Sequence, residues 1–244
     1  MSDHPQPPPE RRRTDPAELG DDRLTGHLKR RRQAAIAGHR SDPDLARALL
    51  GDRDAGVRLL ALGALDRLGE LSNAELTQGL VDPEVTVRRR ACEIAATRPG
   101  VAPSGPAVRP GAGAGAGGGG EAPAVSLLAT LDDSDPIVVE VAAWACGERV
   151  PPEPGAVTRL IELATDHPDA LCREAAVASL GAIGDDAGLP AILAATHDKA
   201  TVRRRAIIAL APFDGPEVDA ALQRATADRD WQVRQAAEDL LADD

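Results

Sequence analysis

The sequence has almost no aromatic side chains and no long hydrophobic run. Its 244 residues include two tryptophans, one phenylalanine and no tyrosine, so alanine, leucine and valine must build the core. This composition favours closely packed helices over a β-sandwich, whose strands favour aromatic and β-branched residues. The longest uncharged stretch, residues 110–120, is almost entirely glycine and alanine. No membrane-spanning helix is therefore expected.

Cysteine is also scarce. The three cysteines, Cys92, Cys146 and Cys172, cannot form a disulfide framework, and none has the CxxC spacing of a redox or zinc motif. We interpret them as small core residues rather than reactive thiols. The first ten residues are proline-rich and polar, unlike a secretory signal. These features predict a cytoplasmic protein.

Lysine is nearly missing, and the charge is uneven along the chain. The net charge is −11, from 28 basic residues, of which two are lysine, and 39 acidic residues. Residues 1–40 carry nine basic and six acidic groups, a balance of +3, so the remainder carries −14. An acidic body argues against general binding of nucleic acid, which requires a basic track to neutralise phosphates.

One pattern, Asp-x-x-Val-Arg-x-x-Ala-x-x-x-Leu, returns six times. Its valine-like position is occupied by Val57, Val87, Val138, Cys172, Val202 and Val233. Apolar residues at offsets zero, four and eight share one helical face, and the acid three residues earlier suits an N-cap. A second apolar run precedes each copy, at residues 44–50, 74–81, 124–131, 156–164, 189–195 and 218–225. The sequence therefore predicts six helical hairpins, each with a first (A) and a second (B) helix.

The residue after the valine-like position is arginine in five of the six copies, namely Arg58, Arg88, Arg173, Arg203 and Arg234. At the edge of the buried face, such arginines are expected to reach the acidic turn of a neighbouring repeat and to form a ladder. The third copy has Val139 instead. This break predicts weaker coupling between repeats two and three.

The run CREAAVASLGAIGD at residues 172–185, with residues 189–193 and 198–206, resembles the HEAT-repeat family. It is most similar to the short form called the phycobilin-lyase HEAT-like repeat, over residues 44–99 and 123–244. The resemblance implies an all-α superhelix, or solenoid, of six hairpins. Relatives include deoxyhypusine hydroxylase, whose iron site resembles repeated His-Glu pairs, but no histidine here precedes a glutamate. That activity is not expected.

The chain divides into four parts by composition. Residues 1–22 are predicted to be a disordered arm, and residues 23–99 a cap helix followed by repeats one and two. Residues 100–122 are a flexible Pro/Gly/Ala-rich insert, and residues 123–244 form repeats three to six. The basic residues 29–32 lie on the cap helix, which either shields the first repeat or contacts an acidic partner or nucleic acid.

No catalytic constellation is visible. His167 and His197 occupy equivalent repeat positions, where four other repeats have aspartate. Equivalent positions on packed helices lie about 8–10 Å apart, too far for two imidazoles on one metal ion. The sequence contains no Ser-His-Asp spacing, phosphate loop or dinucleotide fingerprint. We therefore predict no enzymatic activity, no catalytic or metal-binding residues and no cofactor.

The candidate binding surface is a strip at the fifth and sixth positions after each valine-like residue. In repeats three to five this strip is apolar, which suits an amphipathic helix or a peptide with acidic flanks. The anchor would be Trp144, the floor Val177, Ile207 and Ile208, and the clamps Arg89 and Arg204. The alternative is that curvature buries these side chains between helices, and for Trp144 both interpretations stay open. Trp231 is interpreted as a cover for the end of the stack.

These features favour a non-enzymatic protein-interaction scaffold that binds another protein or peptide on the concave face of the B helices. Two alternatives remain. One is a lyase-like or other enzymatic accessory protein with a small ligand in the groove. The other is a nucleic-acid binder like the HEAT-like alkylpurine glycosylases, whose basic track would here be interrupted by Glu140 and Glu174.

Overall fold

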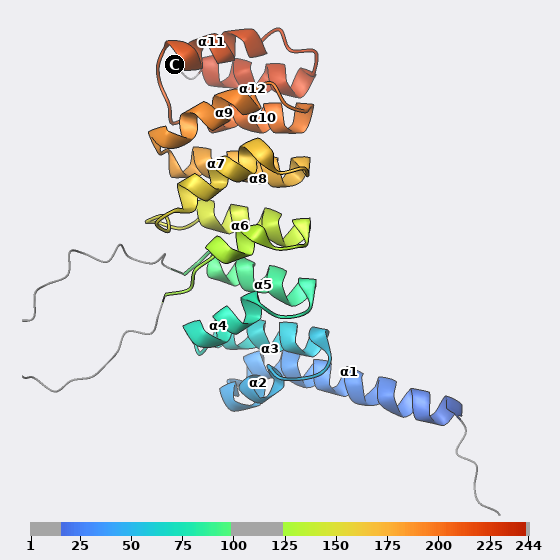
Figure 1. Cartoon of the computed structure of the whole chain (residues 1–244). Coiled ribbons are helices and arrows are strands. Elements are labelled where there is room, and N and C mark those ends of the chain that lie inside the picture. Colours follow the sequence, from blue (N-terminus) through green and yellow to red (C-terminus); the bar gives the residue numbers. More distant parts are fainter. Residues whose placement is uncertain (1–15, 99–123, 243–244) are drawn as a thin grey trace, which may run out of the picture.

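The helices stack in pairs along one axis and form an elongated solenoid (Figure 1). A computed structural model describes residues 16–98 and 124–242, and their side chains from Gly26 onward. Within these ranges the chain forms twelve α-helices and two short 3₁₀ segments, with no strand. The predicted all-α solenoid is confirmed.

Helix α1 (Pro16–Arg40) precedes six hairpins. The A elements are α2 (Pro43–Leu49), α4 (Asn73–Leu80), the 3₁₀ segment η1 (Leu128–Asp132), α7 (Ala156–Asp166), α9 (Leu189–Ala195) and α11 (Pro216–Ala225). The B helices are α3 (Ala55–Leu68), α5 (Val85–Ala95), α6 (Pro136–Gly147), α8 (Ala170–Ile183), α10 (Ala200–Ala209) and α12 (Trp231–Ala242). A second 3₁₀ segment, η2 (Asp186–Gly188), leads into α9.

Two boundaries differ from the sequence prediction. Helix α1 begins at Pro16, so it includes part of the arm predicted to be disordered. The A element of the third hairpin is the five-residue η1 rather than a helix over residues 124–131. Its start is fixed from outside, because the carboxylate of Glu153 accepts the backbone N–H of Leu127 and the hydroxyl of Ser126. Residues 1–15 and the whole predicted insert, residues 100–122, lie outside the described residues.

The repeat positions form the core. All six valine-like residues are buried, and the alanines four residues later are fully buried: Ala61, Ala91, Ala142, Ala176, Ala206 and Ala237. Because alanine has the smallest apolar side chain, the A and B helices approach closely there. The three cysteines are buried and free, as the core interpretation requires, and burial raises the pKa of the Cys92 thiol to about 12.

In four of the six B helices, the residue at the predicted N-cap position forms a side-chain N-cap hydrogen bond. The carboxylates of Asp54, Asp135, Asp169 and Asp230 each accept a backbone N–H from the first turn. Glu84 and Lys199 occupy the position without a side-chain cap. The middle of α1 is bonded to this edge as well, because Arg30 and Arg31 donate to Asp52 and Asp54 at 2.7 and 2.9 Å.

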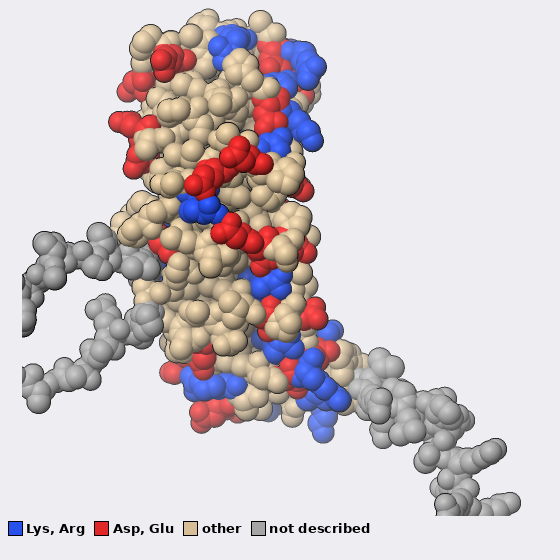
Figure 2. Space-filling model, viewed as in Figure 1, with Lys and Arg blue, Asp and Glu red and all other residues tan. Residues whose placement is uncertain are grey.

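An arginine ladder runs along the turns between A and B helices. Each arginine reaches forward to an aspartate in the next repeat, in the pairs Arg58–Asp82, Arg88–Asp133, Arg173–Asp198 and Arg203–Asp228, at 2.6–2.9 Å. Each also donates to a carbonyl of its own turn. Figure 2 shows positive and negative side chains alternating down this edge.

The ladder is interrupted between repeats three and four, where Val139 occupies the arginine position of repeat three and His167 the aspartate position of repeat four. The predicted weak point between repeats two and three is therefore wrong, since Arg88 bonds Asp133 across that junction. The reason is direction: each arginine reaches forward along the chain, so a missing arginine in repeat three leaves the next junction without a pair. In other repeats the aspartate at this position accepts a backbone N–H of its own turn and also pairs with an arginine of the preceding repeat. His167 makes only the first of these bonds, because its Nδ1 accepts the N–H of Asp169 at 3.1 Å.

The arginines of the ladder lower the pKa of the aspartates with which they pair. At Asp198 and Asp228, the hydrogen bonds from Arg173 and Arg203 are the largest influence and lower the pKa of the carboxyl. At Asp82 and Asp133, burial is the largest influence and raises the pKa, but the bonds from arginine and backbone together outweigh it. The pKa of each of these carboxyls is therefore lower than that of a free aspartate.

A buried arginine joins repeats two and three a second time. The Arg149 side chain is fully buried, donates to the carbonyls of Ala95 and Val125 at 3.1 and 2.9 Å, and lies 3.1 Å from Glu153. Burial lowers the pKa of this guanidinium, and its Nη2 has no hydrogen-bond partner among the described residues. The end of α5 and the segment before η1 are thus held by one side chain.

Candidate functional site

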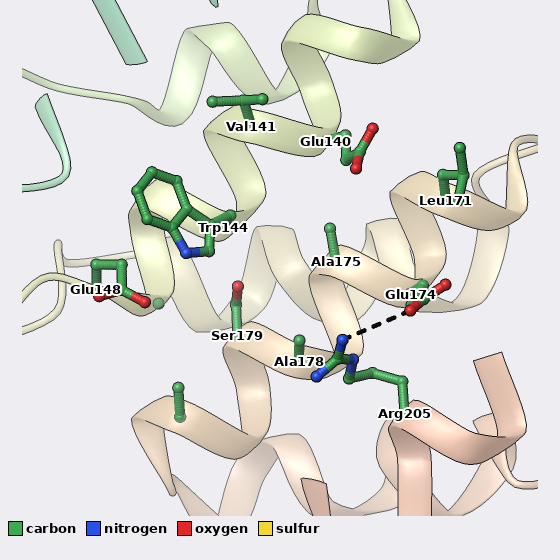
Figure 3. A pocket seen from close by; sticks show the side chains of 12 residues that line it. Glu140, Val141, Trp144, Glu148, Leu171, Glu174, Ala175, Ala178, Ser179 and Arg205 are labelled. Atoms are coloured by element: carbon green, nitrogen blue, oxygen red, sulfur yellow. Dashed lines mark ion pairs between the residues drawn. The ribbon is translucent and has the colours of Figure 1, made fainter. Parts of the chain in front are cut away.

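A groove of about 570 Å³ crosses the B-helix face over repeats three and four. Three consecutive B helices, α6, α8 and α10, contribute its lining. Figure 3 shows Trp144 and Glu148 at one end of the groove, with Glu174 and Arg205 at the other. The volume lies within the range of about 300–1,000 Å³ that is usual for ligand sites.

Helix α6 presents one stripe to the groove. Glu140, Trp144 and Glu148 are spaced by four residues, which places them on one side of the helix about 6 Å apart along its axis. The Trp144 side chain is 44% exposed, so its indole is available to a ligand. The stripe ends at the C-terminus of α6, where the helix dipole adds negative potential to the carboxylates.

Small residues form the floor. Ala175, Ala178 and Ser179 of α8 line it, and the Ser179 hydroxyl is used internally, donating to the carbonyl of Ala143 at 2.8 Å. Helices α6 and α8 touch here, because a Cβ on Gly147 would lie 2.8 Å from the Cα of Ser179. Glycine at this position is required by the packing, and the close contact makes the floor rigid.

The groove is negatively charged. Its lining holds three carboxylates, Glu140, Glu148 and Glu174, and one cation, Arg205. Arg205 lies 3.6 Å from Glu174, a distance for an ion pair rather than a hydrogen bond. Glu140 and Glu148 take no part in the ion pairs among the described residues. Two negative charges of the lining, of which Glu148 lies on the side of the indole, are therefore left for a partner.

The predicted binding strip is only partly exposed. Trp144 and Ile208 are accessible, the latter at 39%. Val177 and Ile207, predicted as floor, are buried in the core at 0% and 1%, so the prediction that they form an exposed floor is wrong. The fifth position lies at the side of the helix, where the neighbouring B helix covers it, whereas the sixth position points farther outward.

The predicted clamps lie apart from the groove. Arg89 is exposed, but its guanidinium forms an ion pair with Glu93 at 3.2 Å. Arg204 lines a second, smaller groove of about 240 Å³ between α10 and α12, together with Ile208 and Trp231. Trp231 is 64% exposed, so it does not serve as the predicted cover over the end of the stack.

Sequence reasoning missed the carboxylates as part of the site. The sequence pattern predicts that Glu140 and Glu174 interrupt a basic track, and it does not point to Glu148. The signal was available, since an acid precedes and follows Trp144 at a spacing of four residues. Among the described residues, no group of histidine, cysteine and acidic side chains has the arrangement of a metal site. None of the described helices is both long and apolar enough to cross a membrane.

Comparison with known proteins supports the repeat assignment. Residues 124–200 and 160–242 match the family model described as HEAT repeats. No curated protein sequence matches the chain. The finer assignment to the phycobilin-lyase type is not tested by these matches.

Solved structures of similar fold include the designed armadillo repeat protein YIII(Dq)4CqI, 16% identical, with a TM-score of 0.52 over 82% of this chain and 98% of that one. The X-ray structure of Escherichia coli YibA is 15% identical, with a TM-score of 0.54 over 96% and 77%. A designed armadillo repeat protein in complex with the peptide (KR)4 is 15% identical, with a TM-score of 0.50 over 88% and 97%. The chain is thus an all-α solenoid, and its residues 124–242 match HEAT repeats.

Proposed function

We propose that this protein is a non-enzymatic scaffold that binds a peptide segment of another protein in the groove between α6, α8 and α10. One observation carries the proposal: Trp144 is 44% exposed within a groove that three B helices build. Exposed tryptophans in grooves are frequent anchors of protein interfaces. The remainder of the lining is preformed, so a partner would not have to reorganise the helices.

Two further features support a peptide as the ligand. The groove crosses several repeats, and a peptide in extended or helical form can follow such a surface. The carboxylates of the lining repel phosphate, which disfavours the nucleic-acid alternative. One solenoid of similar fold was solved with a bound peptide.

We further propose that the repeats are of the short phycobilin-lyase type and that the protein is cytoplasmic, in keeping with its free, buried cysteines.

The test is a selection of peptides from a random display library on the full chain. We expect the selection to enrich peptides that bind the wild-type chain and lose binding to the Trp144→Ala variant. The same peptides should still bind Trp231→Ala, the control variant, because Trp231 is an exposed tryptophan outside this groove. Trp144→Ala should weaken binding by on the order of 2 kcal/mol, the loss usual for a hot spot. Enriched peptides that bind both variants equally would contradict this site.

A further inference from the structure

The charges that line the groove determine which kind of partner side chain it can accept. Resting on the proposed function, we infer that it accepts an arginine side chain from an extended segment of a partner protein. This reverses the sequence-based expectation of a partner with acidic flanks. The inference depends on the placement of charge around Trp144.

The first step is the order of residues on α6. Trp144 lies between Glu140 and Glu148 on one stripe, with each carboxylate about one helical turn away. A cation over the indole face is attracted by the ring and by Glu148, which lies on the same side of α6 in Figure 3, while Glu140 adds negative potential from the other side of the helix. Tryptophan is the best aromatic partner for such a contact. An acidic side chain at the same place would be repelled by both carboxylates.

The second step is the balance of charge. Three carboxylates and one arginine line the groove, and Arg205 is already placed 3.6 Å from Glu174. One further guanidinium beside Glu140 and Glu148 would leave the groove nearly neutral. The C-terminal end of α6, which points at Glu148, adds to the attraction for a cation.

The third step is the choice between arginine and lysine. The floor of Ala175 and Ala178 is small and apolar and can cover the aliphatic stem of a long side chain. A planar guanidinium can stack on the Trp144 indole and still donate to the Glu148 carboxylate on the same side of α6. A lysine ammonium is a point charge that cannot do both equally well. Figure 3 shows the open space between Trp144 and Glu174 above this floor.

The experiment measures fluorescence anisotropy of a labelled octapeptide of alternating serine and arginine with the full chain at physiological salt. Glu140→Gln/Glu148→Gln should weaken binding at least tenfold. The matched control, Glu217→Gln/Asp219→Asn, removes the same charge from exposed positions on α11 and should change binding less than twofold. The lysine version of the peptide should bind several-fold more weakly, and the glutamate version should not bind.

Three outcomes would overturn the inference. If the glutamine pair binds like its control while library peptides still depend on Trp144, the groove binds peptides without selecting arginine. If neither the glutamate pair nor Trp144 matters, the proposed function fails with it. If the chain self-associates through Glu140 and Glu148 and does not bind the peptide, the ligand is an arginine of a second copy. Equal far-ultraviolet circular dichroism of all variants establishes that they are folded.

Discussion

Two neighbouring junctions of the solenoid are built in different ways. Between repeats two and three, Arg88 bonds Asp133 at the turn edge, and the buried Arg149 bonds the carbonyl of Ala95. Between repeats three and four the ladder is missing, and α6 meets α8 through the close contact at Gly147. The groove opens over this second junction. Repeat three is thus joined to repeat two by charged side chains and to repeat four by small residues beneath the groove.

The comparison separates positions that hold the stack from positions that give it a specific surface. The turn edge repeats one ion pair, so its residues are nearly the same in each copy. The position two residues after the valine-like residue is not buried in any copy and varies along the chain: Leu59, Arg89, Glu140, Glu174, Arg204 and Gln235. Only in repeats three and four is this position acidic, and there it lines the groove that contains Trp144.

The largest expected effect is at the junction between repeats two and three. Arg149→Met leaves the Glu153 carboxylate buried without its charge partner and should destabilise the protein by about 3–5 kcal/mol. The free energy of unfolding in urea measures the loss. Arg98→Met, at a half-buried arginine that bonds the carbonyl of Leu71, is the control and should cost clearly less. Arg149→Met/Glu153→Leu should recover part of the loss, and no recovery would contradict the assignment to buried charge.

The ladder pair at the same junction should matter less. Arg88→Met removes a partly buried, two-pronged hydrogen bond and should cost about 2 kcal/mol. Arg234→Met is the matched variant, because among the described residues Arg234 bonds the carbonyl of Asp228 in its own turn and pairs with no aspartate of another repeat. Urea unfolding should show a smaller loss for Arg234→Met. Equal losses would mean that the arginines act within their own repeat rather than between repeats.

Acid should release the attachment of α1. The hydrogen bond from Arg31 is the main influence that lowers the pKa of Asp54 from 3.8 to about 2. Because the folded pKa is the lower one, this contribution is fully present above pH 3.8 and is lost as the pH falls towards 2. Asp54→Asn, which keeps an N-cap acceptor, should cost about 1 kcal/mol at pH 6. The difference from the wild-type protein in urea should vanish near pH 2, and a constant difference would contradict this cause.

The smallest expected effect comes from adding the arginine–aspartate pair that is missing between repeats three and four. Val139→Arg/His167→Asp should create the pair absent between repeats three and four and stabilise the protein by about 0.5–1 kcal/mol. Val139→Arg alone should destabilise it, because the arginine would face His167 without a carboxylate. A double-mutant cycle in thermal unfolding measures the coupling, and additive effects would show that no pair forms.

Much of the fold could be predicted from the sequence because the repeat places one residue type in one environment six times. The valine-like and alanine positions are buried in every copy, and Asp54 caps its helix as expected. The direction of the ladder could not be predicted, since the pattern does not say whether an arginine reaches forward or backward. It is set by how one hairpin stacks on the next.

The candidate site was predicted less well, because it too depends on how one hairpin stacks on the next. Trp144 was identified, but Val177 and Ile207 were placed on the surface although neighbouring B helices bury them. Helical angles describe one helix, whereas exposure depends on the helix beside it. Glu148 was missed because it lies at the end of α6, beyond the positions that the repeat pattern compares.

The most direct measurement is the fluorescence of Trp144 in the variant Trp231→Phe, which leaves it as the single tryptophan. Titration with the unlabelled arginine octapeptide should change its emission until saturation, at the concentration that anisotropy gives. Glu140→Gln/Glu148→Gln in the same background should shift that concentration upward at least tenfold. Peptide binding without any change in the emission of Trp144 would contradict a partner in this groove.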